Sequence, residues 1–518
     1  MNDDHQLLPP EITWYQTPFF RRFIALVCPP LGLLLVWSDA NCSRRRRVVA
    51  TAGILVYCPF YAALLIWLAV LAGVADIEWE GGFGPSIVWH KTSPDYLVLE
   101  RNRQSQREHG KVTPRSDEPA AYWTDFRGPR RDGCYDERSI QTDWNNGDPR
   151  LLWRQPIGGG YASFVVAGGL AFTIEQRREQ EAVTAYQLET GREVWAFHYP
   201  ALFSEWMGGD GPRATPTYRD GLVYSLGATG ELCCLRAATG EVVWRTDVLK
   251  DTKAKNLRYG MAASPLVVGD QVIVLSGEAA PGNAVIAYDR RTGRRLWATL
   301  WDKQAYASPL LATLAGQQQV LIVTAGRALG LATDGSKVFW DYPWKVEYGN
   351  AICLPLIVAT NRFFLSAGYG AGCALVEVNP AGTSFQAREV WRNRNMKNKF
   401  NASVFQDGFI YGLDEGVLTC LDARTGERTW RGGRYGYGQL LLASRCLIVL
   451  GGEGELALVK ATPESFQEVG RVQALEGKTW NVPALADGRL LVRNASQMAC
   501  FDLRDRGQNH FAPATPRR

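Results

Sequence analysis

The chain has 518 residues, of which 46% are hydrophobic and 21% charged, a composition that favours a folded protein over a disordered one. Its 52 glycines and 18 tryptophans predict many turns and many large apolar anchors, which is typical of all-β folds. The formal net charge of +5 is too small to indicate nucleic-acid binding, and we expect no nucleic-acid partner.

Cysteine and histidine usage argues against several kinds of site. The 11 cysteines include no CxxC pair, so zinc-ribbon, thioredoxin-like and c-type haem sites lack their sequence basis. Only one of the five histidines lies within the repetitive region described below, namely His198. The others are His5, His90, His109 and His510. We therefore predict no metal site and no histidine-based catalytic residues.

The N-terminal part of the chain carries a membrane signal. Residues 48–75 contain no charged side chain over 28 positions, enough for a helix across ~30 Å of hydrocarbon, even with Pro59 bending it. Arg44–Arg47 precede this run, and Asp76, Glu78 and Glu80 follow it. The positive-inside rule then puts residues 1–47 on the cytoplasmic side and everything after residue 75 outside. We expect an anchor in the cytoplasmic membrane and a periplasmic main domain.

Three flanking segments are less defined. An earlier apolar run, residues 23–38, is interrupted by Pro29-Pro30 and is either a short first span or an interfacial segment. Because two spans would place Arg21 and Arg22 outside, we favour one span. Residues 76–119 are predicted to be a linker with a short helix within "PDYLVLERNRQSQREHG", and residues 504–518 a loose basic tail.

One short phrase recurs along residues 120–503. It reads "AYQLETGREVW" (185–195), "CLRAATGEVVW" (234–244), "AYDRRTGRRLW" (287–297) and "CLDARTGERTW" (420–430). Degenerate copies lie at 330–340 and 376–391, and a copy near 456–470 has lost its Trp. The tryptophans that mark the repeat lie 39 to 53 residues apart: Trp153, Trp195, Trp244, Trp297, Trp340, Trp391 and Trp430. That period belongs to four-stranded β-propeller blades.

The local chemistry of the phrase fits a blade. Thr-Gly closes a hairpin because glycine tolerates positive φ, and the following strand places its Trp where neighbouring blades bury it. Complete units start near residues 161, 213, 262, 305, 350, 400 and 437. An eighth unit starts near 480 and lacks an outer strand, which "RLLWRQP" (150–156) can supply. We predict an all-β, eight-bladed propeller of four-stranded antiparallel blades, closed between the two ends of the repeat region.

These repeats, with the lead-in "YWTDFRGPRRDG" (122–133), resemble the pyrroloquinoline quinone (PQQ)-like repeat family. That family includes the quinoprotein alcohol dehydrogenases and the outer-membrane assembly lipoprotein BamB, and the lead-in is similar to that of many uncharacterised bacterial members. The resemblance covers residues 120–503 and implies the propeller fold, but the same repeat serves enzymes and scaffolds. The chain departs from the dehydrogenases in lacking CxxCH and a placeable calcium site, and from BamB in lacking an acylation box.

Adjacent cysteines, Cys233-Cys234, bear on the dehydrogenase alternative. The family resemblance implies a vicinal disulfide against the cofactor, held in a loop. Here Cys234 aligns with a column of small residues inside the third strand: Ala185, Ala287, Cys420 and Cys500. We therefore interpret Cys234 as a buried, small, apolar residue that packs between blades.

The long connections between blades are the candidate binding region. Connections such as 198–213, 247–261 and 391–400 all emerge on one face, and seven of them together carry 15 Lys or Arg against 8 Asp or Glu. The residues where the inner strands start converge on the channel mouth: Tyr161, Arg213, Tyr259, Tyr306, Asn350, Asn401, Tyr437, Trp480 and Asn481. They either hold a planar or anionic ligand or plug the channel.

These observations predict a membrane-anchored, non-catalytic binding or scaffold module for an envelope protein or an anionic small ligand. The alternative is a PQQ-dependent dehydrogenase with calcium. PQQ is planar and carries three carboxylates, so it needs stacking surfaces, basic groups and a bound cation. Neither Asp210 nor Glu347 is clearly fixed inward, and Asn350, Asn401 and Asn481 would hold calcium weakly. We therefore predict no cofactor and no catalytic residue.

Overall fold

The protein is described here by a computed structural model, which covers residues 17–38, 42–72, 74–79, 85–88, 94–108, 123–144, 147–205, 207–382 and 384–505. Four of the five histidines and most of the 504–518 tail lie outside these residues. The chain forms two compact units, Met1–Lys91 and Thr92–Arg518, and each is described by itself.

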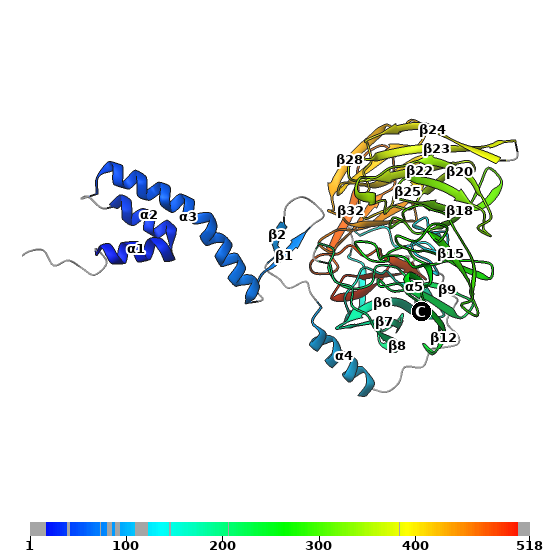
Figure 1. Ribbon diagram of the computed structural model, residues 1–518, viewed down its shortest axis with the longest axis horizontal. Coiled ribbons are helices and arrows are strands. Elements are labelled where there is room, and N and C mark those ends of the chain that lie inside the picture. Colours follow the sequence, from blue (N-terminus) through cyan, green and yellow to red (C-terminus); the bar gives the residue numbers. More distant parts are fainter. Residues whose placement is uncertain are drawn as a thin grey trace, which may run out of the picture. The chain divides into compact units, whose positions relative to one another are not determined.

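The first unit holds three helices, α1 (Pro18–Val27), α2 (Pro29–Ser38) and α3 (Arg44–Leu71), followed by an antiparallel hairpin of β1 (Asp76–Trp79) and β2 (Pro85–Val88). Helix α2 packs against both α1 and α3 (Figure 1). The apolar run 23–38 is divided at Cys28, because Pro29 and Pro30 have no N–H to continue α1. α2, with 10 residues, is about 15 Å long, half the hydrocarbon thickness.

Helix α3 is, within the described residues, the one helix long and apolar enough to cross a membrane. Its 28 residues span about 42 Å. It begins four residues before the apolar run because Ser43 caps it, accepting from the backbone N–H of Arg46 at 3.4 Å. It ends at Leu71, with Ala72 as the C-terminal cap. Arg44–Arg47 therefore form the first turn of α3.

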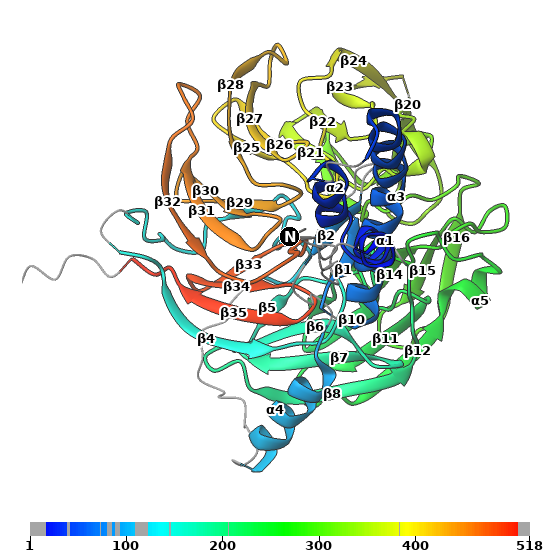
Figure 2. The ribbon, with the colours of Figure 1, turned by 90° about the vertical axis from the view of Figure 1, so that its left-hand side faces the viewer.

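The described residues of the second unit form eight sheets around a common centre (Figure 2). In chain order the first four are β5 (Val165–Ala167), β6 (Leu170–Arg177), β7 (Gln180–Gln187), β8 (Glu193–Pro200); β9 (Thr217–Arg219), β10 (Leu222–Leu226), β11 (Glu231–Arg236), β12 (Val242–Asp247); β13 (Leu266–Val268), β14 (Gln271–Leu275), β15 (Val285–Asp289), β16 (Arg295–Thr299); and β17 (Leu310–Leu314), β18 (Gln317–Val323), β19 (Arg327–Leu331), β20 (Val338–Pro343). We number these sheets as blades 1 to 4.

Blades 5 to 8 follow the same pattern. They are β21 (Leu356–Ala359), β22 (Arg362–Ala367), β23 (Gly372–Ala381), β24 (Ser384–Asn393); β25 (Val404–Gln406), β26 (Phe409–Asp414), β27 (Val417–Asp422), β28 (Arg428–Arg434); β29 (Gln439–Ala443), β30 (Cys446–Leu450), β31 (Glu455–Lys460), β32 (Glu468–Gln473); and β33 (Ala484–Ala486), β34 (Arg489–Arg493), β35 (Gln497–Asp502), β4 (Arg150–Pro156). A short strand, β3 (Cys134–Tyr135), extends blade 7 in parallel with β29. Helix α4 (Tyr96–Glu108) precedes the ring, while α5 (Val248–Thr252) and a 3-10 turn (Glu347–Gly349) lie in connections between blades.

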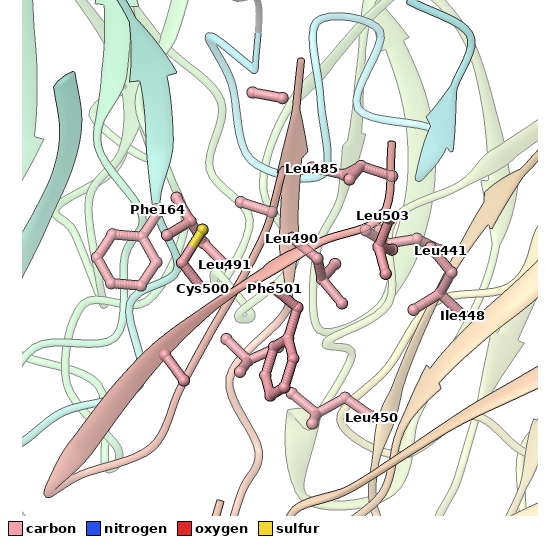
Figure 3. Close-up of a cluster of buried hydrophobic side chains, with 14 of the residues drawn as sticks. Phe164, Leu441, Ile448, Leu450, Leu485, Leu490, Leu491, Cys500, Phe501 and Leu503 are labelled. Atoms are coloured by element: carbon pink, nitrogen blue, oxygen red, sulfur yellow. The ribbon is translucent and has the colours of Figure 1, made fainter. Parts of the chain in front are cut away.

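The ring closes as the sequence predicts. Strand β4 pairs antiparallel with β35, so residues 150–156 complete the blade that begins near 480. Trp153 lies opposite Cys500 in this pairing, and its Nε1 donates to the carbonyl of Leu188 in blade 1 at 2.9 Å. A continuous apolar cluster joins blades 7, 8 and 1 across the closure, as Figure 3 shows for Leu450, Phe501 and Phe164. The expected eight-bladed propeller is confirmed.

Most blade tryptophans face a small residue in their own blade, and five of the seven cover a turn glycine of the next blade. The small residues are those of the column predicted from sequence, with Ala185 opposite Trp195 and Cys234 opposite Trp244, while Trp391 lies opposite Leu375. The ring of Trp195 then covers Gly240 in the Thr-Gly turn of the next blade, and its Nε1 donates to the carbonyl of Ala237 at 2.8 Å. Cys234 is buried, and burial raises the pKa of its thiol to about 12. Gly240 therefore has two roles. It adopts the positive φ that the turn needs, and its lack of a side chain leaves room for the Trp195 ring of the preceding blade.

We expect alanine at Gly240 to be far more costly than alanine at Gly221, although both glycines have positive φ, 74° and 78°. Nothing lies within 4 Å of a Cβ at Gly221, so only the left-handed backbone opposes alanine, at about 1–2 kcal/mol. A Cβ at Gly240 would lie 2.5 Å from Cε3 of Trp195, which adds about 1–3 kcal/mol of overpacking. Denaturation midpoints of the two variants measure the difference. Equal midpoints would show that the Trp195 ring can move away from a Cβ at residue 240 at no cost in stability.

Blade 7 has lost its tryptophan, and a distant residue takes its place. Gly470 of β32 pairs with Leu458, at the position where the other blades have their Trp. Trp144, from the segment before β4, packs directly over this glycine, since a Cβ at Gly470 would lie 2.7 Å from the Cβ of Trp144. Trp144 is 4% exposed and belongs to the apolar cluster of the closure. The segment before β4 therefore seals the seam that the degenerate repeat leaves open.

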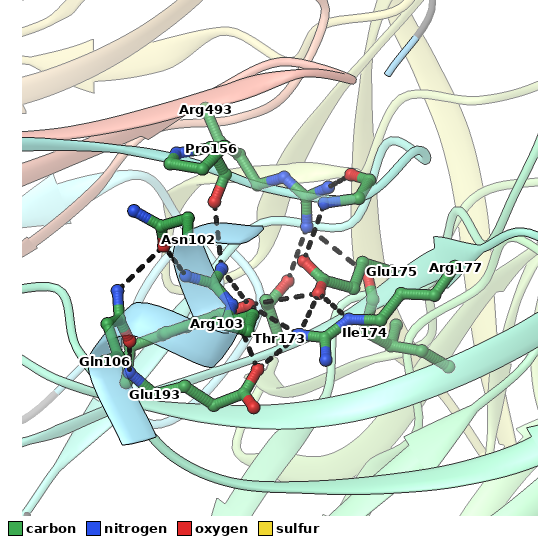
Figure 4. Close-up of polar contacts among 12 residues, drawn as sticks. Asn102, Arg103, Gln106, Pro156, Thr173, Ile174, Glu175, Arg177, Glu193 and Arg493 are labelled. Atoms are coloured by element: carbon green, nitrogen blue, oxygen red, sulfur yellow. Dashed lines mark hydrogen bonds and ion pairs between the residues drawn. The ribbon is translucent and has the colours of Figure 1, made fainter. Parts of the chain in front are cut away.

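Helix α4 lies within the segment predicted as a linker, and it packs on the ring closure. The Arg103 guanidinium is buried and donates to the carbonyl of Pro156 at 2.9 Å and to the hydroxyl of Tyr186 at 3.2 Å, with Glu193 also at 3.2 Å (Figure 4). Burial alone raises the pKa of the neighbouring Glu175 carboxyl, but Arg177, Arg103 and Arg493 outweigh it and hold that pKa below its usual value. This network ties α4 to blades 1 and 8.

Candidate functional site

The propeller has two unlike faces. In each blade the inner strand starts at the face that carries the blade-to-blade connections and runs to the opposite face. The second strand runs back, so the turn between the second and third strands lies on the same face as the connections. We call this the long-loop face; the other, which carries the remaining turns, we call the short-turn face. The residues predicted from sequence to surround the channel mouth all precede inner strands and lie on the long-loop face.

Aromatic rings from several blades meet at the channel mouth. The centroids of Tyr161 and Trp480 lie 5.7 Å apart, and Trp480 stacks at 4.7 Å on Phe400, which lies 5.5 Å from Tyr437. On another sector, Tyr259 and Tyr306 lie 5.7 Å apart. Sequence reasoning missed Phe400 as a mouth residue. The available signal was its position just before the inner strand of blade 6, where other blades place aromatic residues.

Cationic groups lie over these rings. The Nζ of Lys478 is 3.9 Å from the Trp480 ring centroid, and that of Lys399 is 4.6 Å from Tyr437 and 5.2 Å from Tyr369. Partial burial lowers the pKa of Lys399. Tyr369 lies in the turn between the second and third strands of blade 5, and the repeat spacing carries no signal for it. The mouth thus combines stacking surfaces with positive charge.

The Arg213 side chain makes most of its contacts within its own loop, residues 198–213. Its guanidinium lies 4.6 Å from the Phe203 ring and 5.6 Å from the Tyr161 ring. It donates to the carbonyl of Gly209 at 2.6 Å and also to that of Gly211. Burial lowers its pKa. These contacts hold the 198–213 connection in shape and leave little of the guanidinium for a ligand.

The three predicted asparagines are buried behind the rings. Asn481 is 1% exposed, and its amide donates to the carbonyls of Gly160 and Ala162 at 3.2 and 3.0 Å, which links blade 8 to blade 1. Asn401 accepts from the Asn398 amide at 2.7 Å. Asn350 is 7% exposed. Their binding role remains a prediction, and their visible contacts are with the chain itself.

Below the mouth, the channel is filled by the lead-in. Arg131 is 3% exposed and reaches three blades, donating to the carbonyl of Pro309 at 2.8 Å, to that of Ser264 at 3.3 Å and to the hydroxyl of Thr217 at 3.2 Å. Its ion pair with Asp125 measures 3.2 Å. Burial lowers the pKa of this guanidinium below its ordinary value.

Arg127 occupies the opposite side of the channel, where it donates to the carbonyls of Ser403 and Leu440, each at 3.3 Å. Gly133 lets the chain pass closely, because a Cβ there would lie 2.3 Å from Nη2 of Arg127. The segment enters from the short-turn face, where the hydroxyl of Tyr135 accepts from the backbone N–H of Gly488 at 2.7 Å. The sequence motif "FRGPRRDG" is therefore an axial plug that ties blades 2, 3, 4, 6 and 7 together.

A cavity of about 510 Å³ lies away from the mouth. It opens between blades 6 and 7 on the short-turn face, beside Phe409, Tyr411 and Thr462. An ion pair of 2.5 Å between Arg445 and Asp407 lies in its lining. It shares no residue with the mouth.

Comparison with known proteins fits this architecture. A family described as outer membrane protein assembly factor BamB matches residues 133–197 and 179–432. The chain belongs to this family. A relative of that name from Bordetella pertussis is 21% identical over 298 residues, which are 54% of this chain and 68% of the relative.

Solved structures extend the likeness to the fold. BamB from Moraxella catarrhalis is 16% identical with a TM-score of 0.50, and the match covers 70% of this chain and 98% of that one. Quinohemoprotein alcohol dehydrogenase from Comamonas testosteroni is 14% identical with a TM-score of 0.53, covering 79% of this chain and 83% of that one. At these identities the likeness shows the fold alone.

The mouth of this family member does not fit a calcium–quinone complex. Calcium takes six to eight oxygen ligands. Among the described residues no group of three or more His, Cys, Asp or Glu is placed to hold a metal, and Asp210 and Glu347 are both exposed. The aromatic faces that a planar quinone would need are stacked on one another, and Arg213 is bound to backbone carbonyls. No catalytic step is therefore derived through such a group.

Proposed function

We propose that the protein is a non-catalytic binding or scaffold module, anchored in the cytoplasmic membrane by α3 and displayed in the periplasm. Its partner is an envelope protein or an anionic small ligand, bound at the long-loop face. One observation carries the proposal: the axis of the propeller is filled by the chain itself, by Arg127 and Arg131 from one side and by stacked rings from the other. Binding is left to the outer surface.

The chemistry of the mouth supports this assignment. Rigid aromatic rings supply contact area at a low cost in conformational entropy, and Lys399 and Lys478 add positive charge beside them. A partner with an apolar body and a carboxylate or other anionic group suits such a surface. The description of the family as an outer membrane assembly factor favours a protein partner in the envelope.

Photo-crosslinking tests the proposal in cells. A benzophenone amino acid is introduced at Arg258 or Lys478 on the long-loop face, and at Arg424 on the short-turn face as the control, since the Arg424 side chain is 82% exposed. We expect discrete adducts with envelope proteins from Arg258 and Lys478 and none from Arg424, because the stacked aromatic rings of the channel mouth and the lysines over them lie on the long-loop face. Gel analysis of irradiated membranes measures this.

Equal adducts from both faces, or adducts from Arg424 alone, would refute a partner surface at the channel mouth. A stoichiometric, calcium-dependent complex with PQQ that Arg213→Ala weakens would instead support the dehydrogenase alternative.

A further inference from the structure

Three large apolar side chains stand out into solvent on the long-loop face. Trp301 is 80% exposed, Tyr348 is 67% exposed and Leu202 is 49% exposed. They come from the connections between blades 3 and 4, 4 and 5, and 1 and 2. Tryptophan is highly buried on average in folded proteins, so a Trp at 80% exposure is unusual.

Trp301 is held outward by its neighbours. Leu300 before it is 8% exposed and has a positive φ of 68°, and its carbonyl accepts from the N–H groups of Gly282 and Ala284 at 3.0 and 3.3 Å. Asp302 after it is bound by both ends of the Arg327 guanidinium, each at 2.8 Å. A strained backbone held by such contacts on both sides indicates that the outward position of Trp301 is built in.

Tyr348 borders the same turn of blade 4. Its φ is 60°, and the residue after it, Gly349, packs against Ala325, to whose Cβ a Cβ at Gly349 would lie 3.3 Å. The N–H of Ala325 in turn donates to the carbonyl of Lys303 at 3.0 Å, two residues beyond Trp301. The connections that carry Trp301 and Tyr348 therefore flank one turn and present their aromatic side chains on the same face.

The charge around these side chains is positive. Lys253, Lys255 and Lys345 are exposed and form no ion pair within the described residues. Several nearby acids are already engaged: Glu278 with Lys303 at 2.5 Å, Asp302 with Arg327, and Asp247 with the backbone N–H of Lys250 at 2.9 Å. Glu347, beside Tyr348, is exposed and offsets one of the three lysines. Free cations beside exposed aromatic residues are complementary to an anionic surface with an apolar layer beneath it.

The chain also enters the propeller on this face. Pro94 lies beside Gly159, near the channel mouth, since its Cγ would be 3.4 Å from a Cβ at that glycine. Glu100 of α4 forms a bidentate pair with Arg178, at 2.6 and 3.0 Å, in the turn of blade 1 that belongs to the long-loop face. The segment after α3 that leads to this point, residues 72–94, reaches at most about 80 Å, so a membrane that holds α3 stays within range.

We propose that the part of the long-loop face that carries Trp301, Tyr348 and Leu202, outside the channel mouth, docks on an anionic bilayer. These three side chains enter the headgroup region, and Lys253, Lys255 and Lys345 contact lipid phosphates. Trp and Tyr favour the membrane–water interface, and each lysine near an anionic surface adds to the attraction. This inference goes beyond the proposed function. The experiment that tests it measures contact of Trp301 with lipid, so its result does not depend on whether the crosslinking experiment finds a protein partner.

The test uses the full chain in nanodiscs that contain lipids brominated near the headgroup. The fluorescence of Trp301 is obtained as the difference between the wild type and Trp301→Phe, so that quenching of Trp37 and Trp67 in the first unit cancels. We expect Trp301 to be quenched in discs with 30% phosphatidylglycerol. Reversing Lys253, Lys255 and Lys345 to Glu should reduce the docked population at least tenfold, in line with about 1 kcal/mol per lysine.

The matched control reverses Arg236, Arg291 and Arg424, which are exposed on the short-turn face and carry the same total charge; it should leave the quenching unchanged. Trp301 unquenched in anionic discs overturns the proposal, and so does equal loss in both triple variants. Trp301 shielded from acrylamide in native membranes but not quenched by lipid would assign the surface to a protein partner and also overturn it. Unchanged melting curves establish that each variant is folded.

Discussion

Arg131→Ala is expected to destabilise the propeller by about 3–5 kcal/mol, the cost of breaking a buried ion pair by removing one partner. The guanidinium holds carbonyl groups of blades 3 and 4 and the hydroxyl of Thr217 in blade 2. Its loss leaves the carboxylate of Asp125, at 2% exposure, with the Thr124 hydroxyl at 3.0 Å and the more distant Arg219 at 3.7 Å. Urea denaturation of the full chain in detergent measures the change.

The adjacent Arg130 provides the control, because its side chain is 51% exposed and pairs with Asp132 and Asp136 at the surface. Arg130→Ala should cost no more than about 1 kcal/mol. Asp125→Asn, added to Arg131→Ala, should recover part of the loss by removing the uncompensated carboxylate. Equal effects of Arg130→Ala and Arg131→Ala would contradict the role of Arg131 as an axial plug.

Trp153→Ala is expected to cost about 3–5 kcal/mol, as for other buried tryptophans. Trp153 is 8% exposed, covers Gly191 of blade 1 and donates to the carbonyl of Leu188, so its removal opens the seam at which the ring closes. A blade with an open edge also exposes unpaired strand groups, which promotes aggregation. The denaturation midpoint and the aggregation temperature should fall together.

Trp301→Ala is the matched control for this substitution, since it removes the same side chain at 80% exposure. It should leave the free energy of unfolding within about 0.5 kcal/mol of the wild type. If Trp153→Ala were as mild as Trp301→Ala, the closure between β4 and β35 would contribute little to the stability of the ring.

The fold followed from sequence because its determinants are local and repeated. A Thr-Gly turn and a Trp four residues after its glycine specify one hairpin, and the recurrence of that hairpin specifies the number of blades. The ring closure could also be predicted from the sequence, because the last blade lacks its outer strand and the strand at 150–156 belongs to no other blade. Contacts between residues far apart in the chain could not be predicted from the sequence. Examples are the packing of Trp144 over Gly470 and the hydrogen bond from Arg103 of α4 to the carbonyl of Pro156.

For the candidate site, the sequence predicted which residues lie at the channel mouth but not which side chains they contact. The repeat register alone assigned Tyr161, Tyr437 and Trp480 to the channel mouth, since every inner strand starts there. Whether their rings leave a pocket or stack depends on side chains from other blades, and Phe400 lies between Trp480 and Tyr437. Asn481 likewise takes its partners, Gly160 and Ala162, from a blade more than 300 residues away.

By itself, the sequence determined the eight-bladed ring, its closure strand and the single long apolar helix, because periodicity and hydropathy act over short stretches of chain. Only the tertiary structure decided that "FRGPRRDG" plugs the axis. The same arginines would be solvated on an isolated segment, and they become buried because carbonyl groups of four blades and the Thr217 hydroxyl of a fifth converge around them. Such convergence depends on the closed ring, and no local pattern encodes it.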